Sequence, residues 1–429
     1  MSIRVSLLLI ACLFLQAQLH AQKFVANYDE SKIPEFTLPN PLVTEAGEAV
    51  TTAKQWQETR RPEIVDLFQK HVYGRSPAAC KISHKVVSTK DDAVSGKAIR
   101  REVDVFFGDT TDAHSMRLLI YTPKTDKPVA AFLGLNFQGN HSIESDPAIS
   151  LGDRWVRDRR NETVKDNRAT EKARGVASSR WPVEKIIDRG YGLVTIYYGD
   201  IDPDFDDGFK NGIHGAMADQ TKDIPAAEKW GSIAAWSYGL SRALDYLEND
   251  AKVDGDRVAV FGHSRLGKTS LWAGASDERF KMVISNNSGC GGAALSRRAI
   301  GETVGRINTS FPHWFNANFK QYNQNENACP VDQHELIALI APRAVYVASA
   351  TGDQWADPKG ELLAEIHAEP VFRLLGTDGF GVDGVATSKV APDQPIKGGT
   401  IGYHLRTGGH DVTDFDWQQY LDFADRHLQ

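Results

Sequence analysis

A serine stands between a histidine and an arginine at the end of an apolar run in VAVFGHSRLGKTSLW, residues 258–272. The run predicts a buried strand, and a helical pattern begins near Arg265. Gly262 permits the close approach that a sharp turn requires. Ser264 would then lie at a helix N-terminus, where free N–H groups favour a developing oxyanion. The stretch predicts a nucleophilic serine on a strand–turn–helix, although a serine that merely caps the helix fits the same pattern.

A serine hydroxyl is inert without a base and an acid, which on this kind of turn follow in the order serine, acid, histidine. Asp353 comes directly after the apolar run of AVYVASATGDQWADPKGE, with Asp357 close behind. His410 lies in the glycine-rich loop of IGYHLRTGGHDVTDFDW, whereas its rival His404 falls within the strand pattern. A loop leaves a general base free to reach a serine. We therefore predict Ser264, Asp353 and His410 as the catalytic set.

The turn departs in one position from the G-x-S-x-G pattern typical of such serines. Leu266 occupies the place of the second glycine, and Gly267 comes one residue late. The order of serine, acid and histidine along the chain therefore carries more of the prediction than the motif does.

Composition bounds the class of protein. The chain has 429 residues, of which 41% are hydrophobic and 24% charged, and its net charge is −7. This length allows one large α/β domain or two modest ones with a substantial core. The negative charge disfavours nucleic acid and anionic lipid as partners. No CxxC or HExxH spacing occurs, so we expect neither a metal nor a cofactor.

The N-terminus has the pattern of an export signal. Arg4 precedes the apolar run Val5–Leu15, and a small residue, Ala21, comes before the expected cleavage point. We predict a signal peptide over residues 1–21 and an exported protein, periplasmic or secreted, with no membrane span after cleavage. Cys12 is too deep in the apolar run to mark a lipoprotein. In an oxidising compartment the remaining cysteines allow one bridge, with Cys290 and Cys329 as a candidate pair and Cys80 left over.

Short apolar runs alternate with helical patterns from about residue 115 onward, which predicts a mostly parallel sheet covered by helices on both faces. We expect one catalytic domain over 22–429, with an irregular lead-in to about residue 114 that adds a cap and antiparallel edge strands. The predicted strands are SMRLLIYTP, PVAAFLGLNF, YGLVTIYYGD, DRVAVFGH, KMVISNNS, RAVYVASATGD and GTIGYHLRTGG, and the clearest helices are EKWGSIAAWSYGLSRALDYLEND and DFDWQQYLDFADRHL.

Three other segments have both a functional and a structural interpretation, and a fourth has only a structural one. NFQGNHS (136–142) is placed where a second oxyanion loop would lie, with Gly139 and the N–H groups near Asn140 and His141, or it is an ordinary turn. FPHWFNANF either walls a ligand cleft with His313, Trp314 and Phe315 or belongs to the core. The carboxylates of GDIDPDFDDGF, namely Asp200, Asp202, Asp204, Asp206 and Asp207, favour a solvated loop over a calcium site. RGVASSRW, with Arg174, Arg180 and Trp181, is expected to be structural.

The motif GHSRLGK resembles the G-x-S-R-x-G-K signature of glucuronoyl esterases, carbohydrate esterase family 15. The resemblance extends through NFQGNH, SNNSGCGG, GETVGRI, FPHWF, DQWADPKGE and RTGGHD, and thus over nearly the whole mature chain. It implies an α/β-hydrolase fold, a three-layer αβα sandwich. It also implies cleavage of the ester between the glucuronic acid of glucuronoxylan and lignin alcohols, without metal or cofactor.

The resemblance also implies roles for individual residues. Ser264 would be the nucleophile and His410 the base, while Arg265 would stabilise the oxyanion. Substrate sugar hydroxyls would contact Lys268, Glu302 and Trp355.

The acid is where the sequence departs from part of that family. Fungal members carry a glutamate in an ESG motif after the strand that follows the nucleophile, and the matching triplet here begins with Asn287. An asparagine cannot offset an imidazolium charge. The bacterial pattern instead points to Asp353 as the acid, with Asp357 a lesser candidate and Asn287 a hydrogen-bonding neighbour.

Two other functions remain open from the sequence. One is an acetyl or feruloyl xylan esterase on the same fold. The other is a catalytically dead, carbohydrate-binding relative, which the intact serine, acid and histidine argue against.

Overall fold

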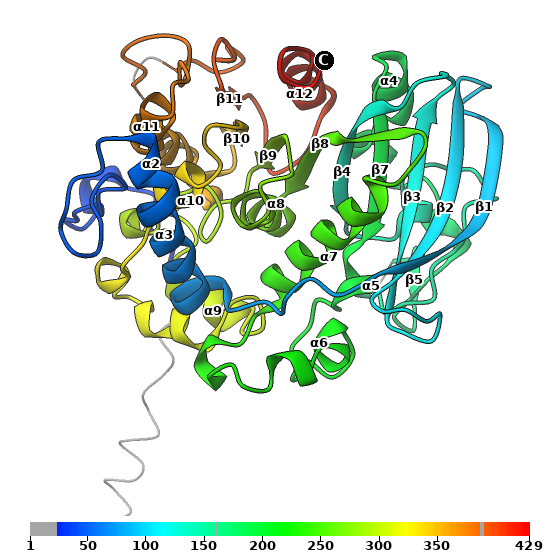
Figure 1. Cartoon of the computed structure of the whole chain (residues 1–429), viewed down its shortest axis with the longest axis horizontal. Helices are drawn as coiled ribbons and strands as arrows, with labels where there is room; N and C mark the ends of the chain where they lie inside the picture. Colours follow the sequence, from blue (N-terminus) through cyan, green and yellow to red (C-terminus); the bar gives the residue numbers. More distant parts are fainter. Residues whose placement is uncertain (1–23, 159–160, 387–389) are drawn as a thin grey trace, which may run out of the picture.

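Continuous apolar runs form the central sheet, as expected for strands that are buried on both faces. The computed structural model describes residues 24–158, 161–386 and 390–429. Its main sheet has nine strands in the order β1-β2-β3-β7-β4-β8-β9-β10-β11. Strands β7 to β11 and β4 run parallel, whereas β1, β2 and β3 form an antiparallel edge (Figure 1). The predicted mostly parallel sheet with antiparallel edge strands is therefore confirmed.

The strands of the main sheet are β1 (Ser83–Ala93), β2 (Ala98–Phe106), β3 (Ser115–Pro123), β4 (Val129–Asn136), β7 (Gly192–Tyr197), β8 (Val253–His263), β9 (Met282–Asn286), β10 (Ala344–Ala350) and β11 (Ile401–Arg406). A separate hairpin pairs β5 (Val164–Lys165) with β6 (Arg168–Ala169). The helices are α2 (Ala53–Gln55), α3 (Arg61–Phe68), α4 (Val183–Asp188), α5 (Tyr198–Ile201), α6 (Ile213–Ala216), α7 (Ser232–Leu247), α8 (Arg265–Ser276), α9 (Val304–Ser310), α10 (Gln333–Ala338), α11 (Pro358–Leu374) and α12 (Asp414–His427).

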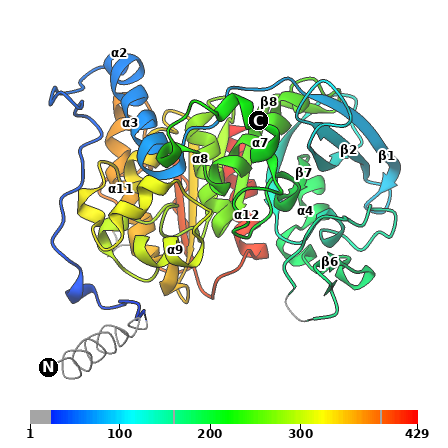
Figure 2. The same ribbon diagram turned by 90° about the horizontal axis from the view of Figure 1, so that it is seen from below.

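Helices cover both faces of the sheet, and alternate strand residues enter two separate cores. In β8, Val258 and Val260 belong to one core, while Ala259 and Phe261 belong to the other. Helices α7, α8 and α11 pack on the first face, and α4 and α12 pack on the second (Figure 2). This is the predicted three-layer α/β arrangement of the α/β-hydrolase fold.

The lead-in before β1 packs on the far end of the sheet. Helix α3 contacts α10, and α2 and α3 lie on the same side of the molecule as α11 in both views (Figures 1 and 2). The buried guanidinium of Arg60 bonds the Glu335 carboxylate at 2.8 Å and so ties the lead-in to α10. The predicted signal peptide, residues 1–21, lies outside the described residues. No helix within the described ranges has the length and apolar character needed to cross a membrane.

The cysteine pairing that the sequence allowed does not occur. Cys80, Cys290 and Cys329 are all free thiols. Cys290 and Cys329 are buried in the core, and burial raises the pKa of Cys329 to about 12. Such thiols are protonated and unreactive at neutral pH.

Candidate active site

The predicted strand–turn–helix around Ser264 is present. β8 ends at His263, α8 begins at Arg265, and Ser264 lies between them with φ 59° and ψ −128°. A non-glycine residue rarely adopts positive φ, and such strain is typical of residues held for function. The Ser264 side chain makes no capping hydrogen bond to α8. Ser264 thus occupies the N-cap position of α8 without capping the helix through its hydroxyl.

Glycine is required just before the serine. A Cβ on Gly262 would lie 1.8 Å from the carbonyl oxygen of Leu266, so no side chain fits where β8 turns into α8. The backbone N–H of Ser264 donates to Asn286 O at 2.9 Å, which ties the turn to the end of β9. The turn is thus locked on both sides.

The predicted acid and base are hydrogen-bonded. Asp353, just after β10, lies 2.6 Å through Oδ2 from Nδ1 of His410, in the loop after β11. Asn287 Nδ2 donates to the same oxygen at 2.8 Å. Burial opposes ionisation of Asp353, but the hydrogen bond and charge of His410, with the Asn287 bond and the Lys268 charge, outweigh it and lower the Asp353 pKa. Asp353 is an anion, and Nε2 of His410 remains available as a base.

The His410 ring also lies beside the nucleophile turn. Its centroid is 4.5 Å from that of His263, the residue directly before Ser264. Ser264, Asp353 and His410 therefore lie at the carboxyl ends of β8, β10 and β11, and the ring of His410 packs against the residue that precedes the serine.

The rival acid and base are engaged elsewhere. Asp357 caps α11 by accepting from Gly360 N at 3.0 Å, and it pairs with Arg298 at 2.7 Å. His404 is fully buried in β11, where Nε2 contacts Asp416 at 2.9 Å and Nδ1 contacts the Tyr346 hydroxyl at 3.1 Å. Both residues therefore have structural contacts in place of the catalytic contacts considered for them.

Arg265 is held by a carboxylate that sequence reasoning missed. Its Nη1 donates to Oδ2 of Asp204, whose side chain has no exposed surface. Oδ1 of Asp204 also accepts from Trp314 Nε1 at 2.8 Å and contacts His313 Nε2 at 2.9 Å. Burial disfavours the charge, but the bonds from His313 and Trp314 and the charge of Arg265 outweigh it, and the pKa of Asp204 falls well below its usual range. Asp204 is a permanent counter-ion for Arg265.

The guanidinium is also enclosed by aromatic rings. Its central carbon lies 4.8 Å from the Trp314 ring centroid, 5.4 Å from that of Phe311 and 5.6 Å from that of Phe137. Cation–π contacts of this kind fix a guanidinium in one orientation. His313, Trp314 and Phe315 are all buried, so the structure supports the core interpretation of FPHWFNANF: Phe315 packs against Tyr73, while His313 and Trp314 bond the counter-ion of Arg265.

The expectation of a solvated carboxylate loop at GDIDPDFDDGF is wrong for three of its five members. Asp200, Asp202 and Asp204 are buried, because the segment continues directly from β7 through α5, which packs against α7 and β3. Asp202 accepts from the Ser232 hydroxyl at 2.5 Å and from Trp236 through its backbone oxygen at 2.8 Å. A run of acidic letters does not distinguish buried partners from solvated ones, and no sequence signal marked Asp204.

The loop after β4 has the predicted glycine turn. Gly139 has φ 99°, and its N–H donates to Asn136 Oδ1 at 2.7 Å. Asn140 bonds Asn136 and Arg117, and His141 is buried. The Gly139 N–H is therefore engaged within the loop. RGVASSRW is structural as expected, with Arg174 paired to Glu171 and Trp181 in the core.

The three predicted sugar-binding residues lie together. Lys268 Nζ is 3.5 Å from Glu302 Oε2, and the backbone N–H of Glu302 donates to Trp355 O at 3.0 Å. Lys268 also donates to Ser288 O at 2.5 Å and to Cys290 O at 2.7 Å. The Trp355 side chain is a large aromatic left 37% exposed. The three N–H donors of buried Lys268 are thus engaged within the protein, and the groups suited to contact a sugar are the Glu302 carboxylate, as an acceptor, and the exposed Trp355 ring.

A cavity of about 210 Å³ adjoins Arg265. Its lining combines the aromatic rings of Phe137, Tyr198 and Phe311 and several small aliphatic side chains with the polar side chains of Gln138, Arg157 and Thr163. The β5–β6 hairpin contributes part of this lining.

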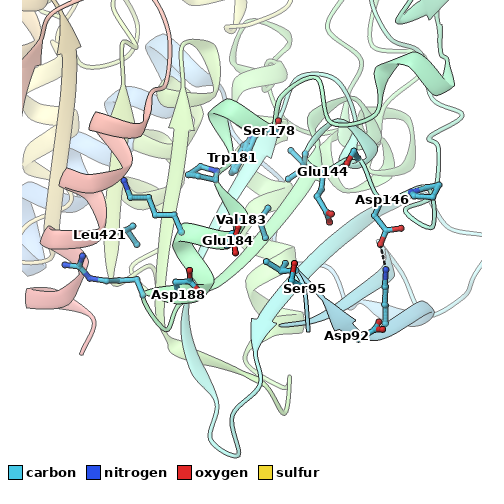
Figure 3. Close-up of a pocket in the computed structure, with 18 residues that line it drawn as sticks. Asp92, Ser95, Glu144, Asp146, Ser178, Trp181, Val183, Glu184, Asp188 and Leu421 are labelled. Carbon is cyan, nitrogen blue, oxygen red and sulfur yellow. Dashed lines mark hydrogen bonds and ion pairs between the residues drawn. The ribbon is translucent and has the colours of Figure 1, made fainter. Parts of the chain in front are cut away.

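A wider pocket of about 1050 Å³ lies by α4, away from the predicted site (Figure 3). Two of its carboxylates are paired, Asp146 with Lys90 at 2.9 Å and Glu184 with Lys97 at 2.7 Å. None of the predicted site residues lines it. We assign no chemistry to this pocket.

The chain is similar to proteins of known class over most of its length. A promiscuous CE15 esterase from a marine bacterial metagenome shares 52% identity with a TM-score of 0.87, covering 94% of this chain and 100% of that one. A glucuronoyl esterase from Solibacter usitatus shares 47% identity with a TM-score of 0.85, covering 93% and 100%. A 4-O-methyl-glucuronoyl methylesterase from Schizophyllum commune is 25% identical over 365 residues, which is 82% of this chain and 76% of that protein.

A family model described as glucuronyl esterase of fungi matches residues 224–376. This segment contains Ser264, Lys268, Glu302 and Asp353, while His410 lies beyond it.

Proposed function

The chain belongs to carbohydrate esterase family 15, the glucuronoyl esterases, and on that premise we propose that it hydrolyses the ester between a glucuronic acid of glucuronoxylan and a lignin alcohol. The observation that carries the proposal is the 2.6 Å bond between Asp353 and His410 beside the strained turn of Ser264. Supporting it are the held guanidinium of Arg265 and the Lys268–Glu302 pair.

The reaction proceeds through a covalent uronoyl-serine. His410 Nε2 takes the proton of Ser264 as Oγ attacks the ester carbonyl, and the tetrahedral oxygen develops its charge near Arg265 and the N-terminus of α8. Asp353 keeps the imidazole oriented and stabilises the imidazolium. When the C–O bond of the ester breaks, His410 gives its proton to the departing alcohol. Water activated by His410 then attacks the acyl-enzyme and releases the uronic acid.

Two groups of residues fit the two parts of the ester. Glu302 offers an acceptor and Trp355 a ring face to the sugar, while buried Lys268, bonded to Ser288 O and Cys290 O, holds the Glu302 carboxylate in place. The 210 Å³ cavity beside Arg265, with the rings of Phe137, Tyr198 and Phe311 in its lining, suits the aromatic portion of a lignin alcohol. Because such substrates are found outside the cell, export under a signal peptide over residues 1–21 is part of the proposal.

Substrate preference tests this function. Purified enzyme is compared on methyl and benzyl glucuronate, on acetylated xylan and on an alkyl ferulate. We expect the highest kcat/KM on the glucuronate esters, with benzyl above methyl because aromatic side chains line the cavity beside Arg265. A preference for acetyl groups or ferulate would instead favour the alternative xylan esterase.

Covalent trapping tests the chemistry separately. A fluorophosphonate should label Ser264, and a rapidly quenched reaction with a glucuronate ester should add one uronoyl group to the same residue by mass spectrometry. Ser264→Ala is the matched control and should show neither product. An unlabelled Ser264 in folded enzyme would favour the catalytically dead alternative.

A further inference from the structure

The loop that carries His410 has little stiffness of its own. Gly408 and Gly409 precede the histidine, and glycine leaves the backbone free to adopt many conformations. A general base misplaced by about 1 Å can cost on the order of 100-fold in rate. The position of His410 must therefore be imposed by contacts from outside the loop.

One buried side chain, that of Arg406, bonds the backbone of the loop on both sides of His410. Nη2 of Arg406, at the end of β11, donates to the backbone oxygens of Gly409 at 2.8 Å and Asp411 at 2.7 Å. These carbonyls flank His410 directly. Arg406 is only 3% exposed, so its guanidinium is held within the protein.

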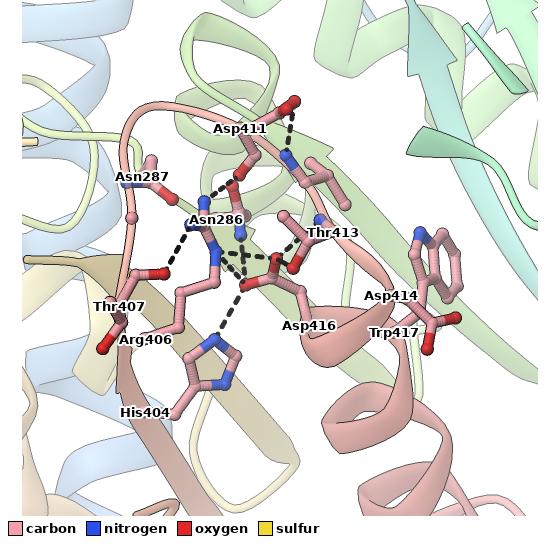
Figure 4. A network of polar contacts seen from close by, with 12 residues as sticks. Asn286, Asn287, His404, Arg406, Thr407, Asp411, Thr413, Asp414, Asp416 and Trp417 are labelled. Atoms are coloured by element: carbon pink, nitrogen blue, oxygen red, sulfur yellow. Dashed lines mark hydrogen bonds and ion pairs between the residues drawn. The ribbon is translucent and has the colours of Figure 1, made fainter. Parts of the chain in front are cut away.

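Arg406 is itself fixed by Asp416, in the first turn of α12. Nε of Arg406 donates to both carboxylate oxygens of Asp416, at 3.1 and 2.9 Å. Asp416 has no exposed surface and also accepts from the N–H and hydroxyl of Thr413 and from His404 Nε2 (Figure 4). Through these bonds the Asp416 carboxylate connects β11, α12 and the loop between them.

Asp416 is also connected to the His410 ring through a second series of contacts, by way of Asn286 and His263. Asn286 Nδ2 lies 3.3 Å from Asp416 Oδ1 (Figure 4). The same amide nitrogen donates to the Tyr420 hydroxyl at 2.8 Å. This orientation leaves Asn286 Oδ1 to accept from His263 Nδ1 at 2.6 Å. Burial, with the nearby charge of His410, lowers the pKa of His263, so its ring is neutral. A neutral ring can pack beside His410 without repelling an imidazolium.

We propose that Asp416 is a positioning residue for the catalytic base: through Arg406 it fixes the backbone on either side of His410, and through Asn286 and His263 it fixes the surface against which the imidazole packs. Neither Arg406 nor Asp416 touches substrate in this proposal. The inference rests on the proposed function only in that His410 activates Ser264, and it is independent of which ester is cleaved.

The test uses fluorophosphonate labelling of Ser264, which needs the base but no sugar. Arg406→Ala should lower the labelling rate about 100-fold, the cost expected for a misplaced base. Added guanidinium ion should restore part of the rate by occupying the vacated site. For methyl glucuronate, kcat should fall by a similar factor while KM stays within about twofold, because the sugar contacts are untouched.

The matched control is Arg343→Ala. Arg343 also donates to backbone oxygens, those of Gly274, Asp277 and Phe280, but it lies at the opposite end of β10 from the site. This variant should lose stability and keep its labelling rate, with no response to guanidinium. Equal loss of labelling in both variants would overturn the proposal.

A second measurement separates positioning from general damage. In a His410→Ala background the slow residual labelling does not use the imidazole, so adding Arg406→Ala should change it by less than about twofold. A further loss of the same size as in the unsubstituted enzyme would overturn the proposal. So would a folded Arg406→Ala enzyme that labels at the unsubstituted rate. If labelling behaves as expected but glucuronate esters are not cleaved, the substrate assignment fails and the positioning role stands.

Discussion

The guanidinium of Arg265 is bonded to the buried carboxylate of Asp204, 61 residues earlier in the chain. Asp204 follows β7 and Arg265 follows β8, while β4 pairs between these two strands. The ion pair therefore spans the carboxyl edge of three strands and brings a fixed positive charge next to the nucleophile turn. A charge already in place needs no reorganisation when the oxyanion forms, which is the basis of electrostatic catalysis.

Removing the counter-ion should misplace Arg265. We expect Asp204→Asn to lower kcat about 10- to 100-fold and to reduce the free energy of unfolding by about 1–3 kcal/mol, because a partly buried guanidinium loses its charged partner. Steady-state kinetics and urea unfolding measure both effects. Asp206→Asn, at an exposed neighbour, is the control and should leave both unchanged. An active Asp204→Asn enzyme would show that Arg265 does not need its partner.

The acid can be assigned by comparing two residues that share one oxygen. Asp353→Asn should reduce kcat by about 10⁴-fold, since an amide cannot stabilise the imidazolium. Asn287→Ala should be mild, because His410 keeps its bond to Asp353. Asp357→Asn, which weakens a helix cap, should lower Tm with little change in kcat. A greater loss of kcat in Asn287→Ala than in Asp353→Asn would reverse the assignment.

Substitutions among the residues proposed to bind the sugar should raise KM. Glu302→Gln removes the charge facing Lys268 and should raise KM for methyl glucuronate about tenfold, as loss of a charged hydrogen bond of about 1.4 kcal/mol predicts. Hydrolysis of p-nitrophenyl acetate, which has no sugar, should be unaffected and is the internal control. Equal losses on both substrates would mean that Glu302 supports the fold and not the sugar.

Asp200 should make stability depend on pH. Burial raises its pKa to about 7 from an ordinary value of 3.8, against the hydrogen bond from Arg117 and the charges of Arg154 and Arg117. The folded state thus binds a proton that the unfolded chain has released. The stability it contributes is full below about pH 4 and is lost as pH rises through about 7.

Asp200→Asn should remove this dependence. Between pH 4 and pH 8 the parent should lose up to about 4 kcal/mol of unfolding free energy that the variant keeps. The variant should therefore gain that much stability relative to the parent over this range. Urea unfolding at a series of pH values measures it, with Asp206→Asn as the exposed control. A difference that stays flat with pH would mean that Asp200 ionises normally in the folded state.

Gly262 should tolerate no side chain. A Cβ there would meet the Leu266 carbonyl at 1.8 Å, so Gly262→Ala is expected to destabilise the enzyme by more than about 4 kcal/mol or to prevent folding. Gly215→Ala, where a Cβ would meet nothing within 4 Å, should fold normally. Thermal unfolding followed by circular dichroism compares the two. A stable Gly262→Ala enzyme would mean that the turn can relax.

Sequence alone predicted those parts of the molecule that depend on local pattern. Continuous apolar runs marked the parallel strands, and because their carboxyl ends meet at one edge, the juxtaposition of Ser264, Asp353 and His410 followed from strand order. The role of Asp204 could not be predicted, because the burial of a carboxylate depends on donors from other segments, here Arg265, His313 and Trp314. The pairing of Cys290 with Cys329 could not be predicted either, because the spacing of two cysteines in the sequence does not show whether their thiols are in contact.

The position of β4 in the sheet also limits how far the chain can be shortened. A fragment beginning near residue 224, where the fungal family model starts to match, would keep Ser264, Asp353 and His410. It would lose β4 and β7, so β8 would become an exposed hydrophobic edge strand. The unpaired backbone N–H and C=O groups of such a strand promote aggregation. Minimal versions for biotechnology should therefore be sought by trimming surface loops and not by cutting between the two halves of the sheet.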